Sequence, residues 1–258
     1  MSQPRILITN DDGIFAPGIY ALWEAMCDIG DPIVVAPETE QSAVGHAITL
    51  TDPLRVVPVQ RSGGFEGFAV TGTPSDCAKI AIKSILDEKP AILVSGINQG
   101  ANVGTNIIYS GTVSAATEGT VLGIPSIAIS LESYKSDDWR GAKKTAVDLA
   151  RHVLQYGIPK GTLLNVNVPY CDPNEIKGIK ITRQGNQYFK DAFDERTDPR
   201  GRTYYWMKGK IIDEDDSLDF DGKAVSEKYV SVTPIHFNVT NKSYLIELNK
   251  QFANGKSS

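Results

Sequence analysis

The sequence predicts an α/β protein with a mainly parallel sheet, followed by an extended C-terminal β arm. Two patterns carry this prediction. Through the first two-thirds of the 258 residues, short β-branched runs alternate with amphipathic helical windows, which is typical of β-α-β units. After Pro169 the alternation ends and polar stretches separate the remaining strands. We therefore expect a core over residues 1–170 and an arm over residues 171–258.

The first strand and helix set the pattern of the core. Apolar residues recur at i, i+3, i+4 and i+7 after the first strand, which predicts one buried helical stripe that Gly30 ends. The stripe consists of Ile19, Leu22, Trp23 and Met26. The five strands expected in the parallel sheet are Arg5–Thr9, Pro32–Ala36, Ala91–Ser95, Ser126–Ser130 and Leu163–Val168.

An antiparallel hairpin is expected between the second and third strands. Residues 54–59 and 65–70 are two apolar runs, and Ser62-Gly63-Gly64 between them is a turn signal, so they form a hairpin inserted at the sheet edge. Thr73-Pro74-Ser75-Asp76 then gives an N-cap, a first-turn proline and an acid at N3, which predicts a helix to about Leu86.

Two more helices complete the core, over residues 112–122 and about 138–156. Beyond Pro169 we expect strands near residues 179–182, 202–207 and 229–234, with no helix between them. Without a crossover helix, this segment is expected not to continue the sheet. It either packs on a second subunit or folds as a flap over its own core.

Composition excludes several classes of protein. A formal net charge of −5 argues against a nucleic-acid scaffold, which needs a basic face to replace counterions. The three cysteines show neither disulfide nor zinc-site spacing. No signal-peptide pattern and no membrane-spanning apolar run are present, so a cytoplasmic protein without membrane contact is expected.

Polar residues follow three of the predicted strands. Asn10-Asp11-Asp12-Gly13 ends the first strand, the loop after the second contains Ser42, and Gly96-Ile97-Asn98 follows the third. Ligands of open parallel sheets bind outside the carboxyl ends of the strands, where such loops meet. We therefore expect Asp11, Asp12, Ser42 and Asn98 to converge.

Two adjacent carboxylates require a compensating partner at neutral pH: a shared proton, a basic group or a cation. The three loops supply no Lys or Arg. Carboxylate, hydroxyl and amide oxygens are hard ligands, which suit Mg²⁺, Mn²⁺ or Ca²⁺ better than Zn²⁺. The alternative is that Asp11 or Asp12 caps the helix that starts near Pro17.

A second candidate site lies in the Gly- and Asn-rich segment 95–119. Ser110-Gly111-Thr112 opens a helix there, and its unpaired N–H groups and dipole would receive a phosphate without a cationic side chain. The alternative is an ordinary N-cap. Dinucleotide and P-loop motifs are missing.

His46 is a further candidate, four residues after Ser42, as a general acid or a substrate contact. The alternative for this residue is a polar surface side chain. We expect His152 and His236 to be structural.

Seven motifs, in order, resemble the SurE survival-protein nucleotidase family. They are ILITNDDGIFAPGI, VVAPETEQSAVGHAITL, GTPSDC, SGINQGANVGTNIIYSGTVSAATEG, LLNVNVP, DPRGRTYYW and YVSVTPI. The resemblance implies a Rossmann-like three-layer core and a metal-dependent phosphomonoesterase for nucleoside 5′- and 3′-monophosphates, with short polyphosphate as a further substrate. It also implies a C-terminal arm that makes oligomer contacts, in a homodimer or homotetramer.

The resemblance assigns roles residue by residue. It implies one Mg²⁺ or Mn²⁺ per subunit on Asp11, Asp12, Ser42 and Asn98, with Asp11 and Asp12 catalytic. It places the phosphate near Asn102 and near Ser110, Gly111 and Thr112. Whether water attacks directly or a carboxylate forms a phosphoenzyme stays open.

Two departures from the family pattern stand out. Thr39-Glu40 replaces a common basic residue and Asn, which would alter substrate preference, and Lys228 replaces a common Gly in the arm.

The alternative function is a non-catalytic nucleotide or metal sensor.

Overall fold

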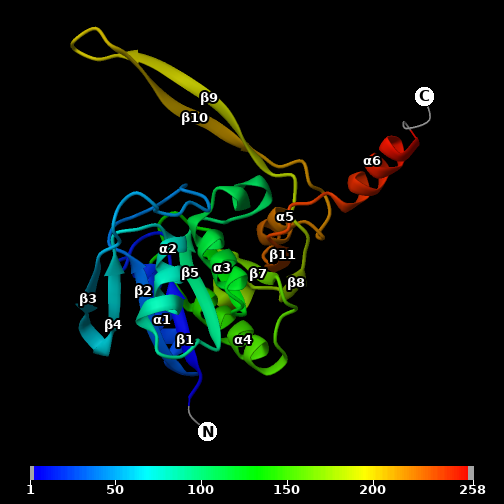
Figure 1. Cartoon of the computed structure of the whole chain (residues 1–258). Helices are drawn as coiled ribbons and strands as arrows, with labels where there is room; N and C mark the ends of the chain where they lie inside the picture. Colours follow the sequence, from blue (N-terminus) through cyan, green and yellow to red (C-terminus); the bar gives the residue numbers. More distant parts are fainter. Residues whose placement is uncertain (1–2, 255–258) are drawn as a thin grey trace.

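The computed structural model describes residues 3–254 and has a three-layer α/β core (Figure 1). Nine strands form the central sheet in the order β3-β4-β2-β1-β5-β6-β7-β11-β8. The first seven strands are β1 Arg5–Thr9, β2 Asp31–Pro37, β3 Val56–Gln60, β4 Glu66–Val70, β5 Ile92–Gln99, β6 Ser126–Leu131 and β7 Thr162–Val168. The α/β class and the mainly parallel sheet predicted from the sequence are confirmed.

β1 contributes to the hydrophobic layers on both sides of the sheet, because successive side chains of a strand point to opposite sides. Ile6 and Ile8 pack with α1 (Pro17–Met26) and α4 (Arg140–Tyr156). Leu7 packs with α2 (Pro74–Ile80) and α3 (Gly111–Val121). The carboxyl end of β1 therefore emerges between two helical layers, at the centre of the sheet.

The predicted hairpin at the sheet edge is confirmed. β3 and β4 pair antiparallel, and β4 pairs parallel with β2, so β3 is the outermost strand. The predicted helix after it is also present. Thr73 and Asp76 form a reciprocal capping box at the start of α2, and a π-helical turn continues α2 over Ala81–Ile85.

The expectation that the chain after Pro169 leaves the sheet is wrong. β11 (Val230–His236) pairs antiparallel with β7, and β8 (Ile179–Ile181) pairs parallel with β11. The sequence argument failed because β11 pairs antiparallel with β7, and an antiparallel neighbour can be joined without a crossover helix. Two helices also occur here: α5 (Asp221–Ser226) lies between the expected strands, where no helix was expected, and α6 (Lys242–Asn254) follows the last of them.

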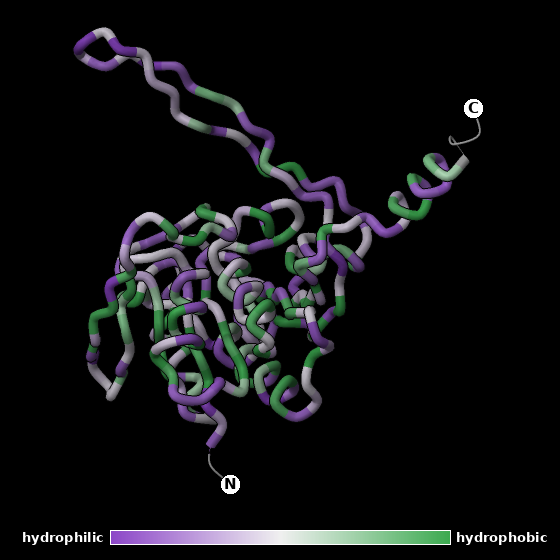
Figure 2. Tube along the Cα trace, in the orientation of Figure 1, coloured by the Kyte–Doolittle hydropathy of each residue, from purple (hydrophilic) through white to green (hydrophobic). Residues whose placement is uncertain are grey.

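The arm is a long hairpin that extends away from the core (Figure 1). β9 (Tyr188–Thr197) pairs antiparallel with β10 (Thr203–Ile212). Figure 2 shows hydrophilic and hydrophobic residues interspersed along it and along α6. The division near residue 170 and the use of the arm in oligomer contacts stay predictions.

Lys228 departs from the family pattern at a position with unusual backbone geometry. Its φ is +65, in the left-handed region where glycine is favoured. Its ammonium pairs with Glu175 Oε2 at 2.8 Å on the protein surface. A glycine at this position would adopt the same backbone geometry without strain.

Phe65 tests the packing of the edge hairpin. Its side chain is fully buried, with its ring 5.3 Å from that of Trp23 in an edge-on contact. We expect Phe65→Ala to lower the free energy of unfolding by about 3–5 kcal/mol because it removes apolar contacts and leaves a cavity. Urea unfolding followed by circular dichroism measures this. Leu50→Ala, at a side chain 84% exposed, is the control, and an equal effect of both variants would contradict the packing described here.

Candidate metal and phosphate site

Asp11 and Asp12 lie in a tight turn at the end of β1. Asn10 Nδ2 donates to Gly13 O at 3.0 Å, and Gly13 has φ +96. A Cβ on Gly13 would lie 3.3 Å from the Thr39 carbonyl carbon, so the turn packs closely on the loop after β2. This close packing requires a glycine and breaks the pleat directly after the two carboxylates.

Asp11 is fixed by the first turn of α3. Its side chain is buried and accepts a 2.5 Å hydrogen bond from Thr112 Oγ1, together with one from the Thr112 backbone. A Cβ on Gly111 would lie 2.6 Å from Asp11 Cβ, so only glycine fits there without a shift. The alternative that an Asp caps the next helix is wrong, since α1 has Ala16 as its N-cap and no side-chain cap bond.

The charged forms of the two carboxylates are electrostatically unfavourable in this turn. Burial raises the pKa of Asp11. Burial, and then the negative charges of Asp11 and Glu40, raise the pKa of Asp12 to about 7. Within residues 3–254 neither carboxylate forms an ion pair with Lys or Arg. A cation is thus the missing partner that would stabilise both charges.

Ser42 reaches this turn through the loop after β2. Gln41 N donates to Asp11 O at 2.7 Å, which holds the neighbouring Ser42 beside the carboxylates. The Ser42 hydroxyl donates to Glu40 Oε1 at 2.6 Å. Glu40, one of the two departures from the family pattern, therefore adds negative charge to the site.

Asn98 was expected in a loop after the third strand of the parallel sheet. The structure places it inside β5 instead. The β5–β6 register shifts between Ser95 and Asn98, and the strand resumes to Gln99. Asn98 Nδ2 donates to Gly100 O at 2.7 Å, so its Oδ1 lies on the other side of the amide. The Gln99 backbone donates to Asp12 and lowers its pKa, which places this part of β5 next to the carboxylates.

These residues fit a hard divalent cation. Two carboxylates, one hydroxyl and one amide oxygen are ligands that Mg²⁺ and Mn²⁺ prefer. No cluster of three His, Cys, Asp or Glu side chains that would hold a metal occurs in the described part of the chain. The site thus depends on neutral oxygen ligands beside the aspartate pair.

Asn102 is held from the sheet side. Its Nδ2 donates to Ser130 Oγ at 2.9 Å, and its backbone N donates to Asn167 Oδ1 at 2.7 Å. The side-chain amides of Asn165 and Asn167 both donate to Asn102 O. Ser130, Asn165 and Asn167 were not predicted as site residues, although two asparagines in a buried strand were a usable signal.

Ser110 and Thr112 have internal partners. The Ser110 hydroxyl accepts from Val113 N at 3.1 Å, so Ser110 is the N-cap that the alternative interpretation described. Thr112 donates to Asp11. The backbone N–H of Gly111, in the first helical turn, is the group of this motif best suited to receive an anion.

His46 faces α3 and not the aspartate pair. Its Nε2 lies 2.9 Å from Glu118 Oε2, and Lys79 Nζ lies 2.6 Å from the other Glu118 oxygen. Burial raises the pKa of Glu118, but the interactions with His46 and Lys79 lower it by more, so the pKa lies below its ordinary value. His46 thus anchors its loop to the middle of α3.

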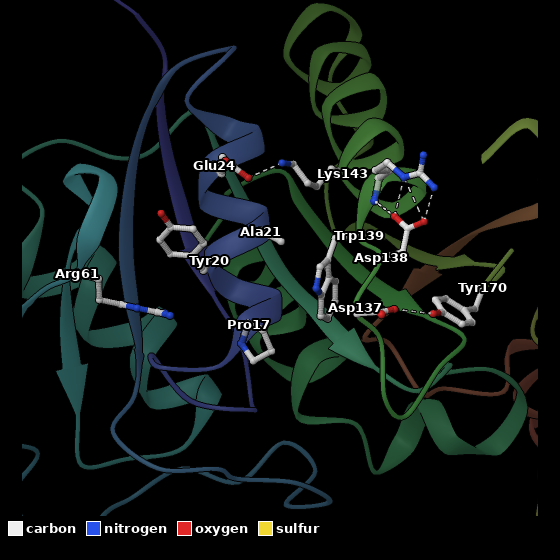
Figure 3. A pocket seen from close by; sticks show the side chains of 11 residues that line it. Pro17, Tyr20, Ala21, Glu24, Arg61, Asp137, Asp138, Trp139, Lys143 and Tyr170 are labelled. Atoms are coloured by element: carbon white, nitrogen blue, oxygen red, sulfur yellow. Dashed lines mark hydrogen bonds and ion pairs between the residues drawn. The ribbon is translucent and has the colours of Figure 1, made fainter. Parts of the chain in front are cut away.

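A groove of about 830 Å³ lies on the other helical face, between α1 and the loop before α4 (Figure 3). Four of its charged side chains form ion pairs, Lys143 with Glu24 and Arg140 with Asp138. It contains none of the predicted site residues. The aspartate turn and the start of α3 therefore remain the candidate site.

The fold and this site indicate a class of protein: a three-layer α/β protein whose candidate oxygen-ligand cation site lies at the carboxyl edge of its sheet, facing a helix N-terminus. The family model described as "Survival protein SurE" matches residues 6–191. With this match over most of its length, the chain belongs to the SurE family.

Several known proteins are similar to this chain over nearly their whole length. A protein from Syntrophobacter fumaroxidans named 5'-nucleotidase SurE is 50% identical over 246 residues, 95% of this chain and 98% of the relative. One from Heliobacterium modesticaldum with the same name is 48% identical, covering 98% and 93%. The crystal structure of the SurE protein from Aquifex aeolicus has a TM-score of 0.83 at 42% identity, covering 96% of this chain and 99% of that one.

The raised pKa of Asp12 predicts how the metal-free protein responds to pH. Unfolded, Asp12 loses its proton near 3.8, whereas the folded protein keeps it to about 7. The folded state binds more protons between these values, so this group makes stability fall as pH rises through that window. Thermal unfolding in EDTA should show a falling midpoint from about pH 5 to 7.5, reduced in Asp12→Asn and reversed by Mn²⁺. Identical pH profiles for the two proteins would refute the assignment.

Proposed function

We propose that the protein is a divalent-metal-dependent phosphomonoesterase that hydrolyses nucleoside 5′-monophosphates to nucleoside and phosphate. The observation that carries the proposal is the Asp11–Asp12 pair, in which the buried Asp11 contacts the first turn of α3. It supplies a cation site and an anion site side by side. Membership of the SurE family and the names of its relatives support the same reaction.

Asp11, Asp12, Ser42 and Asn98 would hold one Mg²⁺ or Mn²⁺. When bound, such an ion neutralises phosphate charge and orients the reacting groups. The chain itself contributes rigid positioning: Thr112 fixes the orientation of Asp11, and the Gln99 backbone fixes Asp12. The Gly111 N–H would bind a phosphate oxygen at the α3 dipole.

The substrate range is the broader part of the proposal. The family resemblance supports 3′-monophosphates and short polyphosphate as additional substrates. The negative charge of Glu40 beside the aspartates would favour substrates that arrive with the cation over free polyanions.

Removal of one carboxylate tests the reaction. We expect Asp11→Asn to lower phosphate release from nucleoside monophosphates by at least about 100-fold, because electrostatic stabilisation of the transition state is lost. EDTA should abolish the wild-type rate, and Mn²⁺ or Mg²⁺ should restore it. Asp87→Asn, at an exposed residue, is the control. Wild-type release by Asp11→Asn would eliminate this site, and nucleotide binding without any release would identify a sensor.

We further propose that the hairpin arm makes contacts between copies of the chain, in a homodimer or homotetramer in the cytoplasm. Large apolar side chains on β9 and β10 are exposed in the single chain, which is unfavourable in water. They include Phe193, Tyr205, Trp206 and Met207, each at least 58% exposed. Among residues 3–254, none of the helices combines the length and apolarity needed to cross a bilayer.

Trp206→Lys tests the arm. We expect this charge to disfavour burial of the hairpin and to reduce the molar mass in solution, measured by size-exclusion chromatography with light scattering. Tyr156→Lys, at an exposed residue of α4, is the matched control. An unchanged mass for Trp206→Lys would show that the arm does not hold the assembly together.

A further inference from the structure

Asp221 is a fully buried carboxylate with only backbone partners. It is the first residue of α5, and no Lys or Arg pairs with it among the described residues. Its Oδ1 accepts from Gly222 N at 2.8 Å and from Gly185 N at 2.9 Å, and Gly104 N donates to both oxygens, at 3.1 Å to Oδ2 and 3.3 Å to Oδ1. Burial raises the pKa of Asp221, while these three donors lower it.

These donors come from three parts of the chain that are distant in sequence. Gly222 belongs to α5, Gly185 lies at the base of the hairpin arm, and Gly104 lies in the loop between β5 and α3. A buried carboxylate is costly unless its oxygens are bonded, and bonds from N–H groups to a charged oxygen are among the strong ones. Asp221 therefore ties the loop to the arm and to α5.

Gly104 is held on both sides of its peptide. Gln184 Nε2 donates to Gly104 O at 2.9 Å, while Asp221 accepts from Gly104 N. Gly104 has φ +57, and a Cβ there would lie 2.3 Å from Gln187 O. Gln187 O also accepts from Thr105 N at 2.9 Å. The loop thus has one tightly fitted position against the base of the arm.

This loop connects both halves of the candidate site. Asn98 lies on one side of it, in β5, and Gly111 on the other, in α3. Asn165 and Asn167 bond the backbone of Asn102, two residues before Gly104, from the sheet. The sheet and Asp221 therefore hold the same short segment from two directions.

We infer that Asp221 is a positioning residue for catalysis: it fixes the β5–α3 loop so that the first turn of α3 faces the aspartate pair. The inference rests on the proposed phosphomonoesterase function. It assigns Asp221 no contact with substrate or metal. A shift of the loop by about 1 Å would be enough to lower turnover strongly.

Asp221→Asn is the discriminating variant. Its remaining oxygen can serve Gly185 and Gly222, while its amide group replaces Oδ2, which accepts the shorter of the two bonds from Gly104 N. The contact with the site loop is therefore the one that is weakened most. Asp215→Asn is the matched control, because Asp215 accepts from Asn186 N at 2.7 Å nearby and forms no hydrogen bond with the loop.

Two readouts are needed, on the full-length protein. Steady-state phosphate release should show kcat lowered at least about tenfold for Asp221→Asn with KM changed less than about threefold, since the inference assigns Asp221 no contact with substrate or metal. Hydrogen exchange followed by mass spectrometry, which requires no turnover, should show faster exchange in peptides covering residues 100–110 and unchanged exchange in β1 and β2. Asp215→Asn should match the wild type in both.

Two outcomes for Asp221→Asn would overturn the inference. Wild-type kcat and exchange in Asp221→Asn would overturn it, and so would uniformly faster exchange, which indicates a general stability role. If Asp221→Asn does not fold, Gln184→Ala removes the second bond to Gly104, and unchanged exchange at residues 100–110 would then overturn it. If the wild type releases no phosphate, faster exchange at residues 100–110 in Asp221→Asn would still show that Asp221 fixes the loop, while the proposed function fails.

Discussion

The repulsion between two adjacent carboxylates, one buried and one partly buried, is the constraint on which the rest of this structure depends. Asp11 and Asp12 lie where β1 emerges between two helical layers, and the surrounding protein supplies neutral donors and no basic side chain. Burying such a pair is costly without a cation. The close packing of Gly13 and Gly111 against this turn keeps the carboxylates together and leaves little room for them to relax apart.

The core elements could be predicted from the sequence because their apolar residues recur with the period of a strand or a helix. Strands such as Arg5–Thr9 and the stripe of α1 are buried on defined faces, so their apolar spacing is visible in the sequence. β9 was missed because its residues are exposed and charged positions interrupt any alternation. β11 was found as a strand but placed outside the sheet, since nothing in its sequence distinguishes an antiparallel neighbour of β7 from an isolated strand.

The candidate site was predictable to the extent that sheet topology brings strand ends together. Asp11, Asp12, Ser42 and Asn98 lie at or after the ends of neighbouring strands. The bond from Gln41 N to Asp11 O and the Gln99 backbone next to Asp12 support their convergence, which stays a prediction. Asn165, Asn167 and Asp221 were not predictable in this way. They act through bonds to backbone groups more than 60 residues away, and such bonds leave no spacing pattern in the sequence.

The strand order also sets when the site can assemble during synthesis. β1 is made first, yet its partner β5 ends at Gln99, and the asparagines of β7 follow after Leu164. The α5 carboxylate that holds the loop emerges last of all, at Asp221. A growing chain therefore carries its two aspartates long before it can complete their surroundings. Metal binding and turnover are consequently properties of the nearly finished chain, because non-local pairing is slow and comes late.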